Sequence, residues 1–173
     1  ELTSMLLAID IGNTNIVLGL YQGKKLITHW RLATQAERTA DEYGVILTQL
    51  VEHGGFRCEQ ISAIAVSCVV PPMLTTAQEL AIRFFDREPL IVGPGIKTGM
   101  PILYENPKDV GADRIVNGIA AYDKYRDACI VVDFGTATTI DLISPKGEYV
   151  GGAIAPGLSI SLEALVQRAS KLP

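Results

Sequence analysis

The chain has 173 residues, of which 48% are hydrophobic and 20% are charged. This length and composition indicate one globular domain or two small ones, and they exclude a disordered chain. The net charge of -4 and the lack of a basic stripe argue against nucleic acid as a partner, and no apolar run approaches the roughly 20 residues of a membrane-spanning helix.

The cysteines and histidines form no pattern typical of a metal site or a disulfide framework. Cys58, Cys68 and Cys129 contain no C-x-x-C pair, and His29 and His53 stand far from any acidic or cysteine cluster. An odd number of cysteines with such spacing is typical of a reducing compartment, so we expect a cytoplasmic protein without zinc.

Hydrophobic periodicity and turn residues predict three antiparallel strands at the start of the chain. A capping box at Thr39 and Glu42 predicts a helix that ends at Gly54. The expected elements of this half are strands at 5–10, 16–21 and 26–32, the helix from Thr39, a strand at 61–70, a helix at 71–85 and a strand at 90–92.

The second half begins with a long segment rich in proline and glycine, residues 93–109. Long loops inside compact domains are usually functional. The expected elements after it are a helix at 110–125, a strand at 129–133, a hairpin at 139–144 and 149–155, and a helix at 158–169.

The opening of the chain is repeated in its second half. An Asp-x-Gly turn joins two strands at Asp10 and again at Asp133. We therefore predict a duplicated α/β fold whose mixed sheet opens with three antiparallel strands. The predicted domains are residues 5–120, with the first turn and the long loop, and residues 121–173, the start of a second copy that is incomplete at the end of this chain.

Each Asp-x-Gly turn has the chemistry of a phosphate cradle. Gly12 and Gly135 are expected to adopt positive φ and to let consecutive amides form a nest around an anion. Asp10 and Asp133 would repel phosphate, so they are expected to bind a cation or its waters. One such turn is common in hairpins, but two at equivalent positions favour a function. The alignment of the two turns continues by pairing Ile16 with Thr139.

Other phosphate chemistries do not fit the sequence. It has no G-x-x-x-x-G-K-[ST] motif, and the similar run at 93–98 has the wrong spacing. An aspartyl-phosphate mechanism would require a second acid two residues after the first, where Gly12 and Gly135 stand.

Asp113 is the candidate general base, in a helix start that follows the long loop. A kinase needs a carboxylate that accepts the proton of the acceptor hydroxyl. The same position also suits a carboxylate that only complements the helix dipole, and the sequence leaves both roles open. The planar fork of Arg114 can hold a carboxylate or a phosphate. Tyr104, in the same loop, can line a small-molecule pocket, although a lone aromatic residue is more often core or surface.

Three motifs in this order resemble the type III pantothenate kinase family: residues 10–17, 111–117 and 132–141. Residues 151–157 agree as well, and the resemblance covers residues 5–173. It implies the actin-like (ribonuclease H-like) fold of the superfamily that includes acetate and sugar kinases, heat-shock proteins and actin. It also implies transfer of the ATP γ-phosphate to the primary hydroxyl of pantothenate, which gives 4'-phosphopantothenate and begins coenzyme A biosynthesis.

The resemblance also assigns roles to individual residues. Asp113 is the expected proton acceptor, Asp133 the ligand of a monovalent cation (potassium or ammonium), and Asp10 the residue that serves magnesium. The residues expected to contact ATP are Asp10, Ile11, Gly12, Asn13, Thr14, Asn15, Ile16, Val17 and Thr136. Those expected to contact pantothenate are Tyr104, Gly111, Ala112, Asp113 and Arg114.

Members of this family form cytoplasmic homodimers and are longer than this chain. Two alternatives remain at this level. A nucleotide-binding accessory or regulatory protein of the same fold would keep both turns without kinase activity, although Asp113 and Arg114 argue against it. A different small-molecule kinase would bind another acceptor in the loop at 93–109.

Overall fold

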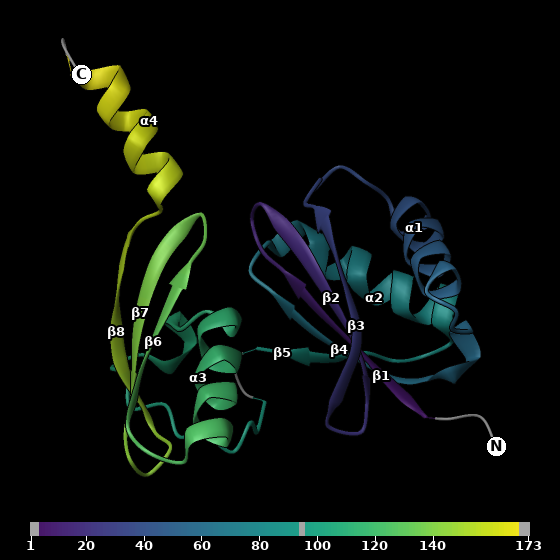
Figure 1. Ribbon diagram of the computed structural model, residues 1–173, viewed down its shortest axis with the longest axis horizontal. Helices are drawn as coiled ribbons and strands as arrows, with labels where there is room; N and C mark the ends of the chain where they lie inside the picture. The colour runs from purple at the N-terminus through teal and green to yellow at the C-terminus, as the bar shows by residue number, and fades with distance from the viewer. Residues whose placement is uncertain (1–3, 94–95, 170–173) are drawn as a thin grey trace. The chain divides into compact units, whose positions relative to one another are not determined.

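The computed structural model describes residues 4–93 and 96–169 (Figure 1). The chain divides into two compact units, Glu1–Gly93 and Pro94–Pro173. Each unit has its own β-sheet. No helix in the described ranges is long and apolar enough to span a membrane.

The first unit contains a mixed five-stranded sheet in the order β3-β2-β1-β4-β5. The first three strands are antiparallel, as predicted, whereas β4 runs parallel to β1 and β5 parallel to β4. The elements are β1 (Met5–Ile11), β2 (Asn15–Gln22), β3 (Lys25–Ala33), α1 (Ala40–His53), the short 3-10 helix η1 (Cys58–Gln60), β4 (Ile61–Cys68), α2 (Pro71–Phe85) and β5 (Leu90–Val92).

Alternating side chains of β1 build the core of this unit. Met5, Leu7, Ile9 and Ile11 are buried, while the residues between them are partly or fully exposed. Period-two alternation places all four on one face of the sheet, where they share a core with residues of α1 and α2. The alternation that predicted the strand therefore also determines which face is covered.

Helix α1 begins with the predicted capping box. The Glu42 amide donates to Thr39 Oγ1 over 3.3 Å, and the Thr39 amide donates to Glu42 Oε2 over 2.9 Å. These bonds lower the pKa of Glu42, chiefly through the backbone of Thr39. The reciprocal bonds satisfy two amides that a helix start otherwise leaves without partners.

A close contact joins α1 to α2 at Gly44. A Cβ atom added to Gly44 would overlap the ring of Phe84. The two helices can therefore approach this closely only because position 44 carries no side chain.

The second unit contains an antiparallel three-stranded sheet in the order β6-β7-β8. Its elements are the 3-10 helix η2 (Pro107–Asp109), α3 (Ala112–Tyr125), β6 (Cys129–Phe134), β7 (Ala137–Ile143), β8 (Tyr149–Pro156) and α4 (Leu158–Arg168). Helix α3 was expected from residue 110, but it starts at Ala112 because η2 occupies the preceding residues and Val110 is buried as its C-cap.

Helix α3 packs on the sheet of the second unit. The buried cluster there combines Ile115 of α3 with Ile143 and Tyr149 of the sheet. The compact units thus divide between residues 93 and 94, whereas the predicted domains divide between residues 120 and 121. Most of α3 falls between these two positions, and its packing groups it with β6 and β7.

The opposite face of this sheet is apolar and exposed. Ile130, Val132 and Phe134 of β6 are 66%, 47% and 69% exposed, and the neighbouring side chains of β7 are exposed as well. Figure 1 shows α4 continuing beyond the end of β8. The helix also carries exposed apolar residues, namely Leu158, Ile160, Leu162, Leu165 and Val166.

Candidate functional site

The first Asp-x-Gly turn connects β1 to β2 through three residues, Gly12, Asn13 and Thr14. The Gly12 amide donates to the Asn15 carbonyl oxygen over 3.0 Å and closes the turn. Positive φ was predicted for Gly12 and is wrong, since neither this glycine nor Gly135 has it. Glycine instead relieves crowding, because an added Cβ would lie 3.2 Å from the Asn15 carbonyl oxygen, which is a tight contact.

Thr34, which the sequence reasoning missed, holds this turn from the end of β3. Its Oγ1 donates to the Gly12 carbonyl oxygen over 2.6 Å, and its amide donates to the Thr14 carbonyl oxygen over 2.9 Å. A phosphate cradle must keep carbonyl oxygens away from the anion, and Thr34 engages two of them. No local pattern marks this role, because the threonine is 22 residues from Gly12.

Asp10 lies beside this turn on the exposed side of the strand. Its cross-strand neighbours are Val17 on β2 and Ser67 on β4. The carboxylate is exposed, whereas Ile9 and Ile11 on either side are buried. This position suits a carboxylate that meets a hydrated cation.

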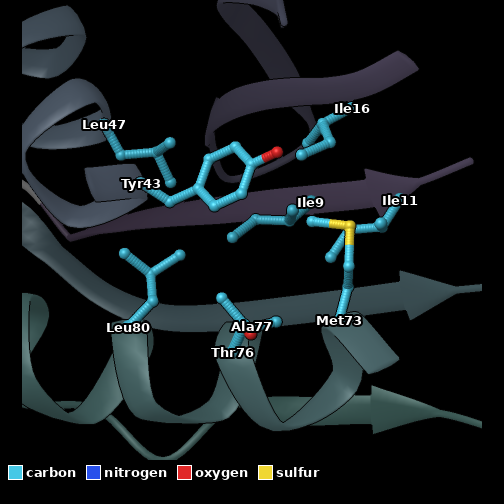
Figure 2. Close-up of a pocket in the computed structure, with 9 residues that line it drawn as sticks. All are labelled: Ile9, Ile11, Ile16, Tyr43, Leu47, Met73, Thr76, Ala77 and Leu80. Carbon is cyan, nitrogen blue, oxygen red and sulfur yellow. The ribbon is translucent and has the colours of Figure 1, made fainter. Parts of the chain in front are cut away.

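An apolar hollow lies on the buried side of the same strands (Figure 2). Tyr43 and Leu47 of α1 and Met73 and Leu80 of α2 point toward it. Its other lining residues are Ile9, Ile11, Ile16, Thr76 and Ala77. A nucleotide phosphate needs donors or cations, so this hollow is part of the hydrophobic core and not a phosphate site.

The second turn resembles the first but is one residue shorter. The Gly135 amide donates to the Ala137 carbonyl oxygen over 3.0 Å. Asp133 faces Thr139 across the hairpin, whereas Asp10 faces Val17. The structural counterpart of Thr139 is therefore Val17, so the predicted pairing of Ile16 with Thr139 is wrong by one residue.

Gly157 holds the second turn from the start of α4. Its amide donates to the Thr136 carbonyl oxygen over 3.0 Å. A Cβ at this position would overlap the carbonyl groups of Gly135 and Thr136. The glycine at position 157 thus permits a close approach that any other residue would prevent.

Asn117 is a second residue that the sequence reasoning did not assign. Its Nδ2 donates to Asp133 Oδ2 over 3.1 Å. It follows Asp113 by one helical turn, so both side chains lie on the same side of α3. The structure thereby brings the predicted base and the predicted cation ligand to one helix face. The sequence did carry one signal for Asn117, since its four-residue spacing from Asp113 places both residues on the same face of a helix.

Asp113 has a capping contact at the start of α3. Its Oδ1 accepts a hydrogen bond from the Arg114 amide over 2.8 Å, while the N-cap residue Gly111 offers no side chain. This bond supports the capping role that the sequence left open. It uses one carboxylate oxygen and is compatible with proton acceptance by the other.

Arg114 is buried in an ion pair with Asp141. Its Nε lies 2.8 Å and its Nη2 2.6 Å from Asp141 Oδ1, and the hydroxyl of Tyr149 donates to the same oxygen over 2.6 Å. Arg114 is 9% exposed, and Asp141 and Tyr149 are fully buried. Nε therefore forms a hydrogen bond inside the protein, whereas Nη2 and Asp141 Oδ2 are buried and form none within the described residues.

The pKa values of this cluster follow from its burial and charges. Burial alone would lower the pKa of Arg114, but the hydrogen bond and charge of Asp141 raise it. Burial, followed by the bond to Asp141, raises the pKa of Tyr149. Both groups therefore keep their protons at neutral pH.

Gly152 provides the room that this ion pair needs. An added Cβ would lie 2.5 Å from Arg114 Nη2 and 2.7 Å from Asp141 Oδ1, and it would overlap the Ile140 carbonyl oxygen. This crowding explains why a glycine stands here in the segment 151–157.

Tyr104 is tied to the same region through β8. The Leu103 amide donates to the Tyr149 carbonyl oxygen over 2.8 Å, and a Cβ on Gly151 would lie 3.8 Å from the Tyr104 ring. Tyr104 is 41% exposed. Within the second unit, the structure therefore gathers the residues predicted for the acceptor around α3 and β8.

Within residues 4–93 and 96–169, no three or more His, Cys, Asp or Glu side chains are grouped so that they could hold a metal ion. His29 and His53 are exposed, and the three cysteines are free thiols. A cation at Asp10 or Asp133 would therefore need further oxygens from phosphate, backbone or water, which is common for magnesium.

A family model for type III pantothenate kinase matches residues 6–173. Two curated type III pantothenate kinases, from Anaeromyxobacter sp. (strain K) and Geobacter sulfurreducens, are each 59% identical over 169 residues, which is 98% of this chain and 66% of theirs. The chain belongs to the type III pantothenate kinase family. It spans just under two thirds of the length of these relatives.

The fold agrees with an actin-like architecture. A Ppx/GppA phosphatase from Aquifex aeolicus superposes with a TM-score of 0.55 at 15% identity, over 94% of this chain and 55% of the phosphatase. At this identity the similarity concerns the fold alone. The predicted α/β, actin-like class is confirmed.

Proposed function

We propose that this protein is an ATP-dependent pantothenate kinase that produces 4'-phosphopantothenate, the first step of coenzyme A biosynthesis. The observation that carries the proposal is 59% identity to curated type III pantothenate kinases over 98% of the chain. No feature of the described residues favours the accessory protein or a kinase for another acceptor.

On the donor side, we assign residues Asp10–Val17 to ATP, with a further contact from Thr136. Turn amides and threonine hydroxyls offer donors to phosphate oxygens. The engagement of the Gly12 and Thr14 carbonyls by Thr34 supports this role. Asp10, exposed at the end of β1, would hold magnesium, which neutralises phosphate charge when it is bound.

On the acceptor side, Tyr104, Gly111, Ala112, Asp113 and Arg114 would contact pantothenate. The Asp113 carboxylate would accept the proton of the primary hydroxyl as that oxygen attacks the γ-phosphorus. The helix start is compatible with this role, because the Arg114 amide binds Oδ1 and leaves Oδ2 to accept the proton.

Asp133 would bind the monovalent cation, potassium or ammonium. The Asn117 amide supports this assignment by orienting the carboxylate. Turnover should fall when potassium is omitted, and Asp133→Asn should remove that dependence. A variant that keeps the full potassium response would contradict the role of Asp133.

A cytoplasmic homodimer is part of the same proposal. The free thiols of the described chain support a reducing compartment, and the dimer rests on the family resemblance alone. Light scattering at several protein concentrations would measure the oligomeric state.

The decisive experiment incubates the protein with ATP, magnesium, potassium and pantothenate and detects phosphopantothenate by mass spectrometry. The relative from Geobacter sulfurreducens serves as a parallel control. A folded protein without product, beside an active control, would overturn the proposal. ATP binding without product would favour the accessory protein, and turnover with another hydroxyl acceptor would favour a different kinase.

A further inference from the structure

The role of Asp141 goes beyond the assigned acceptor contacts. This residue is fully buried, lies on β7 and pairs with Arg114, which stands 27 positions earlier on α3. Asp141 and Asp133 both lie on the face of the sheet that α3 covers, because strand pairing places Val131 opposite Asp141 and Val131 belongs to the core beneath α3.

The ion pair leaves one part of the guanidinium for a ligand. Nε and Nη2 face Asp141 Oδ1, at 2.8 and 2.6 Å. Nη2 is buried and forms no hydrogen bond in spite of this short distance, whereas Nη1 is not among the buried unpaired atoms of the described residues. Nη1 is therefore the nitrogen that this inference assigns to an external carboxylate. An arginine held on one edge also keeps a single orientation, whereas a free arginine must lose its rotamer freedom when it binds.

The surroundings fix this orientation from three further directions. The Tyr149 hydroxyl donates to the same Asp141 oxygen, and the Arg114 guanidinium lies 5.9 Å from the Tyr149 ring centre. The backbone of Gly152 lies close to the guanidinium, because a Cβ atom added there would lie only 2.5 Å from Arg114 Nη2. These contacts restrict the position of the guanidinium.

The geometry points to Asp141 as a positioning residue that holds Arg114 so that Nη1 binds the carboxylate of pantothenate, and thereby selects an anionic acceptor. This inference rests on the proposed function. Asp141 itself touches no reacting atom and acts through Arg114.

A purely electrostatic role would give the opposite result. Removing the negative charge of Asp141 makes the cluster more positive, which by itself would strengthen the binding of an anion. Loss of positioning weakens the same binding. The sign of the change therefore distinguishes the two effects.

The experiment compares pantothenate with pantothenol, its neutral analogue in which an alcohol replaces the carboxylate. Calorimetry measures both affinities for the wild-type protein and for Asp141→Asn. We expect Asp141→Asn to lower the affinity for pantothenate by about tenfold or more and to leave that for pantothenol nearly unchanged. The KM for ATP should not change.

Tyr122→Phe is the matched control. It removes a tyrosine hydroxyl bond in the same unit, to the Pro145 carbonyl oxygen over 3.2 Å, without touching the Arg114 cluster. It should lower stability while it preserves the ratio of the two affinities. Equal losses for both ligands in Asp141→Asn would show a structural role only, and an unchanged or higher affinity for pantothenate would overturn positioning.

A measurement on the wild-type protein covers the case in which Asp141→Asn does not fold. The Arg114 Nε proton should exchange slowly with solvent in NMR spectra, and pantothenate should shift the Nη signals. Fast exchange at Nε would overturn the inference by itself. Wild-type protein that binds no pantothenate would overturn the proposed function and this inference with it.

Discussion

At the scale of single residues, Thr34 holds the first turn through two hydrogen bonds to its carbonyl oxygens. Thr34→Val keeps the shape and the backbone bond to Thr14 but removes the 2.6 Å bond to the Gly12 carbonyl oxygen. Loss of one such bond is worth about 1 kcal/mol, or about fivefold in affinity. We expect the KM for ATP to rise by that factor and the KM for pantothenate to stay constant. Thr28→Val on β3 is the control, and an unchanged KM for ATP would contradict the role.

Asp113→Asn tests proton acceptance apart from capping. An asparagine oxygen still accepts the Arg114 amide, so the helix start is retained, but the amide cannot take up a proton. We expect kcat to fall by about 10²–10⁴-fold with unchanged ATP binding. Asp123→Asn, near the other end of the same helix, should retain activity. A fully active Asp113→Asn would mean that the carboxylate only caps α3.

The crossing of α1 and α2 supplies a prediction at the scale of elements. Gly44→Ala gains up to about 1 kcal/mol of helix propensity, but its methyl group overlaps the Phe84 ring. Overpacking costs about 1–3 kcal/mol, so we expect a net loss of stability in urea unfolding. Gly44→Ala combined with Phe84→Leu should recover part of the loss. If Gly44→Ala alone were more stable than the wild type, α1 and α2 would be able to move apart at little cost, and the prediction would be wrong.

The local elements were predictable, because their causes lie close together in the sequence. The alternation of β1 and the Thr39–Glu42 box depend on neighbours within a few residues. The Arg114–Asp141 pair and the Thr34 bonds depend on residues 27 and 22 positions apart, which periodicity does not report. Sequence reasoning therefore identified the planar fork of Arg114 as a group that can hold a carboxylate, but it did not identify Asp141 as a partner.

The second turn shows the same limit within a repeat. Similar residues at Asp10 and Asp133 indicated equivalent turns, and the hairpins do share a closing hydrogen bond from each glycine. The number of residues between the strands differs by one, so the register after each turn differs as well. Hairpin length depends on backbone geometry that the shared motif does not specify.

At the scale of the whole molecule, Tyr149 links unfolding to alkaline pH. Burial and the bond to Asp141 raise the pKa of Tyr149 above its ordinary value of 10.0, so at alkaline pH the folded state keeps a proton that the unfolded state releases. The contribution of Tyr149 to stability is therefore full below pH 10 and falls as the pH rises from there toward the raised pKa. Urea midpoints measured from pH 8 to 11 should decline, and Tyr149→Phe should decline less steeply. If the urea midpoints of the wild type and of Tyr149→Phe fell equally with pH, Tyr149 would not be the group responsible.

The exposed apolar side chains of β6, β7 and α4 should control how readily this protein precipitates in salt solutions. Side chains such as Phe134 and Leu158 are 69% and 71% exposed, and a net charge of -4 gives little repulsion between molecules. Salts that strengthen apolar association should therefore precipitate the protein readily. Phe134→Ser should raise the ammonium sulfate concentration needed for precipitation, whereas a substitution on the exposed polar surface, such as Glu59→Gln, should not.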